Sequence, residues 1–138
     1  MEIHIEGLDS VRDMLNERAE QIAENIAKGV AEAGELVKGA AKDLAPVKSG
    51  ALRDSITSEA DGNTAIVGTN IEYGIYVEFG TGSKGDPSVP HTSKEKWTYC
   101  SDGQFYTTSG QPPQPYLVPA LKNNEDKIIE TIKNAVMK

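Results

Sequence analysis

Residues 10–44 read SVRDMLNERAEQIAENIAKGVAEAGELVKGAAKDL, and this stretch decides the fold. Its apolar residues recur every three or four positions, which predicts one amphipathic helix with a single apolar stripe. Asp9 or Ser10 is the expected N-cap, with Asp13 placed as in a capping box. Pro46 ends the helix, because a proline disfavours helical angles in the residue before it. The stripe consists of Leu15, Ala19, Ile22, Ile26, Val30, Ala33, Val37, Ala40 and Leu44.

The length of this helix is unusual for a small domain. Unbroken, it would span about 50 Å at about 1.5 Å per residue. Gly29, Gly34 and Gly39 lie inside it, and each costs up to about 1 kcal/mol of helix stability relative to alanine. We therefore expect a bend or break near Gly34. The alternative is a straight helix that projects from the body of the protein to meet a neighbour.

Shorter elements surround the helix. Residues 2–6 alternate apolar and polar side chains, which predicts a short half-buried strand. Residues 47–55 predict a turn followed by one or two helical turns. The segments 56–59 and 64–68 predict two strands, and the Asp-Gly-Asn sequence between them is a strong hairpin signal. Residues 71–79 fit either a helix or a strand, and both alternatives stay open.

The composition changes from Gly80 to Pro115, where glycine, serine, threonine and proline are frequent. Within this excursion, residues 97–100 and 105–108 are β-like runs around a turn at 101–104, which predicts a second small hairpin. Long excursions of this kind are usually functional or partly disordered, so we expect a flexible arm over about residues 80–113. Aromatic side chains concentrated in an extended loop are common at protein interfaces, although they could equally hold the hairpin shut. These aromatic residues are Trp97, Tyr99, Phe105 and Tyr106.

The last segment, residues 116–138, has the apolar spacing of a second amphipathic helix. The expected fold is therefore α+β. In it, a long N-terminal helix and a C-terminal helix pack on a small antiparallel sheet, and a hairpin arm extends from them. The 138 residues fit a single domain. Aromatic residues make up only 6% of the chain, which predicts a thin core.

Charge and cysteine content exclude several classes of function. The formal net charge is −7, whereas binding to DNA phosphates needs a basic surface. Sequence-specific nucleic-acid binding is therefore not expected, although DNA could pass nearby. One cysteine cannot form an internal disulfide, and the sequence shows neither a secretory signal nor an apolar run long enough to span a membrane. We expect the protein to remain in the cytoplasm where it is made, unless something carries it out.

The residue types that carry catalysis are sparse. His4, His91 and Cys100 lack partners at the spacing of a metal site or of a cysteine–histidine pair. The glycine-rich loop at residues 80–85 is not a phosphate-binding loop, because its lysine precedes a glycine and prolines follow. We therefore expect no cofactor, no metal and no enzymatic activity.

Glu78 is the exception among the carboxylates, because it lies between Val77 and Phe79 in an apolar stretch. Catalysis is one interpretation, and a structural ion pair or a backbone cap is the interpretation we favour. A buried carboxylate needs a partner. Arg53 is the only arginine outside the N-terminal helix, and a guanidinium can bind a carboxylate through two parallel hydrogen bonds. We therefore expect an Arg53–Glu78 ion pair.

Three segments in this order carry a resemblance to a known family. They are residues 45–56 directly after the long helix, residues 73–82, and residues 113–121 before the last helix. Together they resemble the tail-completion and head–tail joining (neck) family of minor tail components in lambda-like siphophages and prophages, and residues 3–8 look like its first strand. The motif positions are Pro46, Gly50, Leu52, Arg53, Ser55, Ile56, Tyr73, Val77, Glu78, Phe79, Gly80, Thr81, Pro115, Leu117, Pro119, Ala120 and Leu121.

This resemblance implies a structural virion protein of a tailed phage or prophage without catalytic activity. It implies an oligomeric ring subunit at the head–tail junction or the tail end, whose partners are other copies of itself and neighbouring neck or tail proteins. The alternative is a small cytoplasmic regulatory or inhibitor module that binds one protein partner.

Overall fold

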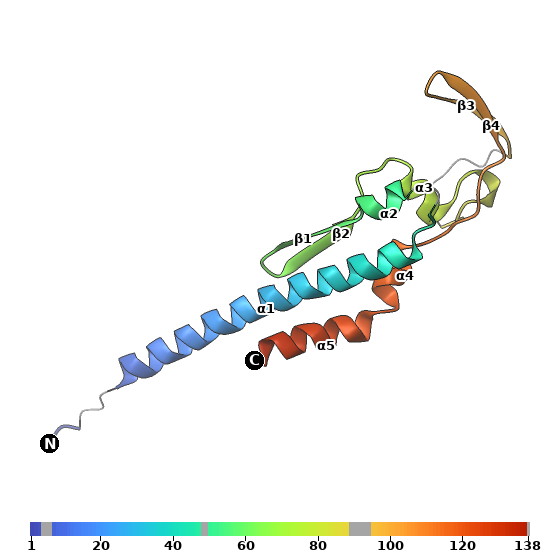
Figure 1. The fold of residues 1–138 in the computed structure, drawn as a ribbon. Coiled ribbons are helices and arrows are strands. Elements are labelled where there is room, and N and C mark those ends of the chain that lie inside the picture. Colours follow the sequence, from blue (N-terminus) through green and yellow to red (C-terminus); the bar gives the residue numbers. More distant parts are fainter. Residues whose placement is uncertain (4–6, 48–49, 89–94, 138) are drawn as a thin grey trace.

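The computed structural model describes residues 1–3, 7–47, 50–88 and 95–137. Helix α1 (Leu8–Leu44) runs through the molecule as its axis, and the other elements gather around its C-terminal half (Figure 1). A β-hairpin lies along one flank of α1 and helix α5 along the other. The expected α+β class, with a long N-terminal helix, a C-terminal helix and small antiparallel sheets, is confirmed.

Helix α1 begins earlier than expected, because Gly7 takes the left-handed conformation (φ 94°) that starts it. The N-cap at Asp9 or Ser10 was therefore placed wrongly. The helix ends as expected: Ala45 is extended (ψ 129°) before Pro46.

The predicted break near Gly34 is wrong, because α1 is one uninterrupted helix of 37 residues. Two of its glycines lie where other elements come close. A Cβ atom on Gly34 would lie 2.5 Å from Oγ of Ser58 in the hairpin, and one on Gly29 would lie 2.9 Å from Cα of Ile132 in α5. These glycines therefore permit close packing against the helix and do not bend it.

Strands β1 (Thr57–Asp61) and β2 (Thr64–Gly68) form the first hairpin, which contacts α1. Their antiparallel register pairs Thr57 with Gly68 and Asp61 with Thr64, which confirms the expected turn at 61–63. Ile56 was expected in the strand, but it follows helix α2 (Ala51–Ser55) and its side chain is 2% exposed.

The ambiguous segment at 71–79 contains helix α3 (Gly74–Phe79), followed by a short 3-10 turn, η1 (Gly82–Lys84). Strands β3 (Trp97–Ser101) and β4 (Gln104–Thr108) pair antiparallel as a separate two-stranded sheet. The second hairpin is therefore confirmed, and it extends away from the rest of the fold (Figure 1).

The C-terminal helix is broken into α4 (Leu117–Lys122) and α5 (Glu125–Val136), where one helix was expected. The break falls at two consecutive asparagines. The side chain of Asn124 donates a hydrogen bond to the carbonyl of Ala120 at 2.8 Å, and such local side-chain bonds compete with regular helix pairing. Of the strand expected at residues 2–6, residues 4–6 lie outside the described residues, and residues 2 and 3 are in no strand.

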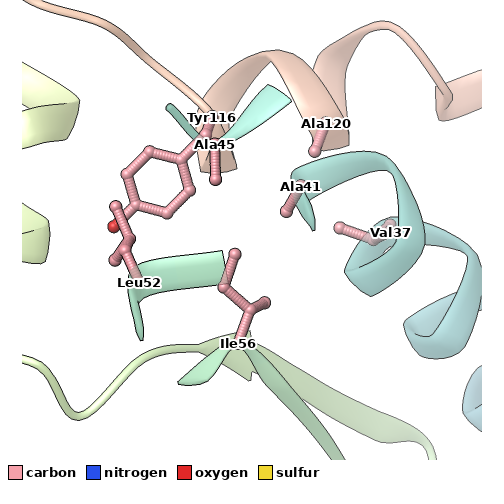
Figure 2. Packing of buried hydrophobic residues seen from close by; sticks show 7 residues of the cluster. All are labelled: Val37, Ala41, Ala45, Leu52, Ile56, Tyr116 and Ala120. Carbon is pink, nitrogen blue, oxygen red and sulfur yellow. The ribbon is translucent and has the colours of Figure 1, made fainter. Parts of the chain in front are cut away.

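A small core forms where the C-terminal end of α1 meets α2 and α4 (Figure 2). Within the described residues, Tyr116 and Ile56 are the largest side chains that are fully buried. Three of the seven members are alanines, so the core is thin, as the low aromatic content predicted. The members are Val37, Ala41, Ala45, Leu52, Ile56, Tyr116 and Ala120.

Candidate assembly surfaces

The side chain of Tyr116 is the point where the three sequence motifs meet. Its hydroxyl donates a hydrogen bond to the carbonyl oxygen of Gly74 at 2.9 Å, and its ring lies beside Leu52 of the first motif (Figure 2). Burial raises the pKa of Tyr116 above its usual value, and the charges of Glu78 and Tyr73 raise it further. The motifs therefore form one structural unit inside the protein.

Glu78 caps helix α4 from within this unit. Its Oε2 accepts hydrogen bonds from the backbone N–H groups of Tyr116 (2.7 Å) and Leu117 (3.0 Å), and its Oε1 accepts one from Val118 (2.9 Å). The first N–H groups of a helix have no partner within the helix, and a negative charge there is favourable. Of the alternatives weighed for Glu78, the structure shows the backbone cap, and it holds both carboxylate oxygens in place.

The predicted ion pair between Arg53 and Glu78 is wrong. Arg53 lies at the surface, where its Nε contacts Oδ1 of the neighbouring Asp54 at 3.2 Å. Glu78 is only 4% exposed and is bonded to backbone groups. The carboxylate did need partners, but amide groups from a segment 38 residues away supply them.

Residues Gly80 and Thr81 fix the base of the hairpin arm. Gly80 has a positive φ of 76°, and a Cβ atom there would lie 2.7 Å from the carbonyl oxygen of Gln111. Thr81 and Gln111 form an isolated antiparallel bridge, with N–O distances of 2.9 and 3.3 Å. The arm therefore leaves the body from a closed base that only glycine allows at position 80.

The arm presents the first of the candidate surfaces. Tyr99 and Tyr106 stack across the hairpin with their ring centroids 5.6 Å apart, so this pair holds the hairpin together. Phe105 is 78% exposed, whereas Trp97 is half-buried. The two tyrosines therefore stabilise the hairpin by stacking on each other, and Phe105 is the most exposed aromatic side chain of the arm, available to a partner.

The other motif residues have structural places. Gly50 starts α2 with a φ of 83°. Ser55 Oγ donates a hydrogen bond to the carbonyl of Leu52 at 2.6 Å, and it also lies 2.5 Å from Thr69 Oγ1. Val77 and Leu117 pack against the core, and Ala120 is fully buried within it. Pro119 lies in the first turn of α4. Of the remaining positions, Phe79 and Pro46 are half-buried, and Pro115 and Leu121 are exposed.

An open apolar groove of about 560 Å³ is the second candidate surface. Helix α1 forms its floor, strand β2 forms one wall, and α4 with α5 forms the other. Ile66 on the first wall is 68% exposed, and Val118 on the second is 39% exposed. The lining residues are Val30, Ala33, Gly34, Val37, Asn63, Ala65, Ile66, Val67, Leu117, Val118, Leu121, Ile128 and Ile132.

The N-terminal half of α1 is the third candidate surface. It extends beyond the hairpin and α5 (Figure 1), and every residue from Leu8 to Gln21 is exposed. Large apolar side chains on this half are 52–68% exposed. A cluster of exposed apolar side chains is unusual on the surface of a monomeric protein. The side chains of this cluster are Leu8, Val11, Met14 and Leu15.

Sequence reasoning found the arm and the possibility of a projecting helix, but it missed the groove. The apolar residues Ile128 and Ile132 contribute to the spacing that predicted a second amphipathic helix, and that pattern says nothing of a groove. Whether a second element fills the space above the apolar face of such a helix depends on tertiary arrangement, which a spacing pattern does not contain.

Among the described residues, no group of three or more histidine, cysteine, aspartate or glutamate side chains is arranged to hold a metal ion. His4 and His91 lie outside this part of the chain. Of the helices that the structure describes, none combines the length and the apolar character needed to cross a membrane.

Comparison with known protein families gives a match. Residues 9–80, slightly more than half of the chain, match a family described from bacteriophage HK97 gp10, a proposed tail component. The matched region covers most of α1, the first hairpin and α3. No curated protein and no solved structure matches the chain.

Proposed function

Because the chain belongs to the HK97-gp10-like family of phage tail components, we propose that it is a ring subunit of the virion. In this role it joins copies of itself and contacts neighbouring neck or tail proteins at the head–tail junction or the tail end. Its part is structural, and it has no catalytic step to perform.

The observation that carries this proposal is the set of exposed apolar side chains on the N-terminal half of α1. This half of the helix extends beyond the hairpin and α5 (Figure 1). Contiguous exposed apolar side chains of this kind mark protein interaction sites. The arm adds Phe105, which is 78% exposed. The buried carboxylate that could have suggested catalysis is instead bonded to backbone amides.

The test is the mass of the purified protein measured by sedimentation over a wide range of concentrations, together with electron microscopy of the largest species. A closed oligomer of defined size supports the proposal. A monomer at every concentration that binds one partner tightly supports the regulatory or inhibitor module and contradicts the ring. Detection of the protein in purified virions by mass spectrometry tests its location separately.

A further inference from the structure

The apolar stripe of α1 is continuous, but only one half of it is covered. Along the C-terminal half, Ala33 and Val37 are 6% and 8% exposed. On the same face, Leu15 lies about three turns before Ile26 and is 66% exposed, and Leu8 lies about five turns before Ile26 and is 67% exposed. Because residues three and four apart share a helix face, a single face of α1 has a covered half and an uncovered half.

The groove lies on the covered half of this same face, and it is only partly filled. Val30, Ala33 and Val37 form its floor. Ile66 (68% exposed) and Leu121 (52% exposed) stand at its two sides. The chain therefore carries an apolar ridge, formed by the exposed side chains of Leu8, Val11, Met14 and Leu15, that packs in no groove of the described part of its own subunit. It also carries an apolar groove that is only partly filled.

We propose that the N-terminal half of α1 from one subunit lies in the groove of a second copy. This inference deepens the proposed function, on which it rests, by naming the two surfaces that join neighbouring subunits. An amphipathic helix that places its apolar face in a hydrophobic groove is a recurring mode of recognition. The contact is head-to-tail, because ridge and groove are different surfaces, and repeated head-to-tail contacts close into rings when the rotation allows.

The charges beside the two surfaces are complementary. Arg12 and Arg18 border the apolar stripe on opposite sides, as the helical spacing of about 100° per residue places them. The hairpin beside the groove carries Glu59 and Asp61, and its residues 57–68 include no lysine or arginine. Because the two arginines lie on opposite sides of the stripe, one arginine of a docked helix would meet this acidic wall.

The size of the contact also fits a ring. The 15 residues from Leu8 to Ile22 span about 22 Å in a helix about 10 Å across, so seating them lengthwise buries on the order of 400 Å² of each partner. One such contact falls below the roughly 1,000 Å² in total that a stable pair needs. In a ring each subunit makes two contacts, one through its helix and one through its groove. Isolated pairs are therefore weak, and closed rings are favoured.

Disulfide crosslinking tests the contact. In a Cys100→Ser background, which removes the single native thiol, Leu15→Cys combined with Ile66→Cys should give covalent multimers on mild oxidation. Both side chains are largely exposed in the subunit, so neither substitution disturbs its fold. The matched control is Glu17→Cys with Ile66→Cys, because Glu17 lies on the opposite face of α1. Equal crosslinking of the two pairs overturns the proposal.

A second pair distinguishes the possible occupants of the groove. Phe105→Cys with Ile66→Cys should remain uncrosslinked, and efficient crosslinking there instead would identify the arm as the occupant and overturn the proposal. If rings of unchanged mass form but the Leu15–Ile66 pair does not crosslink, this docking is rejected and the proposed ring function is not. A monomer at all concentrations rejects both.

A substitution that places a charge on the apolar stripe of α1 tests the docking independently, through its effect on self-association. Leu15→Asp should weaken self-association by about tenfold to a hundredfold, since it removes the burial of one leucine side chain. Its thermal unfolding as a monomer should match that of the unchanged chain, because the side chain of Leu15 is 66% exposed in the subunit. Glu17→Ala, on the opposite face, should leave association unchanged. Unaltered association of the Leu15→Asp variant contradicts the proposal.

Discussion

The carboxylate of Glu78 accepts a hydrogen bond from the backbone N–H of Tyr116 at 2.7 Å, which joins two segments that are 38 residues apart. The hydroxyl of Tyr116 returns to the same helix and binds the carbonyl of Gly74. A two-way connection of this kind fixes the start of α4 against α3, and thereby sets the position of one wall of the groove.

Glu78→Ala should destabilise the protein by about 3–5 kcal/mol, because one buried and two partly buried backbone N–H groups lose their acceptor. Arg53→Ala should cost less than about 1 kcal/mol, since its contact with Asp54 is at the surface. Chemical denaturation of each variant gives the two values. In the double variant the two losses of stability should add. A coupling energy above about 0.5 kcal/mol would instead indicate that Arg53 and Glu78 interact.

Stability should fall at alkaline pH through Tyr116. Its pKa in the folded protein is raised above 10.0, first by burial and then by the charge of Glu78. The unfolded chain therefore loses the proton first as pH rises, so the stability due to this group is complete below pH 10 and is lost above it. Tyr116→Phe should cost about 1 kcal/mol at pH 7 and should show a shallower alkaline loss. Equal slopes for both proteins above pH 10 would contradict this.

Two glycines of α1 should respond oppositely to the same substitution. Gly29→Ala should destabilise by about 1–3 kcal/mol, because its Cβ would lie 2.9 Å from the backbone of Ile132. Gly39→Ala should stabilise by up to about 1 kcal/mol, since a Cβ there meets nothing within 4 Å and alanine favours the helix. Thermal unfolding of the two variants is the measurement, and a stabilising shift for Gly29→Ala would show that α5 does not pack closely on Gly29.

Limited proteolysis of the isolated subunit should cut first within residues 80–113. The composition of this segment buries little apolar surface, so its order should come mainly from neighbours. Cleavage there should slow when the protein is assembled. First cuts elsewhere, with the arm intact, would contradict the prediction.

The sequence was sufficient for elements that local rules determine. The apolar spacing of residues 10–44 predicted α1, and Asp61-Gly62-Asn63 predicted the first turn. Local rules failed where tertiary contacts decide. The glycine at position 34 was interpreted as a break, because helix propensity contains no information about Ser58 packing against it. The partners of Glu78 were missed for the same reason, since backbone amides leave no signature in a sequence.

The motif residues were predicted as a group, and the structure brings several of them, among them Leu52, Glu78 and Ala120, to the core that contains Tyr116. Their role could not be predicted in detail, because a proline, a glycine or a leucine at a turn has the same signature whether it holds a fold together or faces a partner. Ile66 lies outside all three motif segments, and Val118 lies within the third segment but is not one of its motif positions; both side chains are exposed. Surfaces for assembly are defined by what remains uncovered after folding, and spacing rules do not report that.

The projecting half of α1 has one further consequence, which concerns when the subunit becomes competent to assemble. A helix of about 15 residues held only by its own backbone bonds is marginally stable in water. In the free subunit we therefore expect rapid amide hydrogen exchange from Leu8 to Gln21, with protection appearing only after association. Helix formation and association then become a single cooperative event. On the proposed docking, this half of α1 would become stably ordered only when subunits associate, so assembly would depend steeply on the concentration of the subunit.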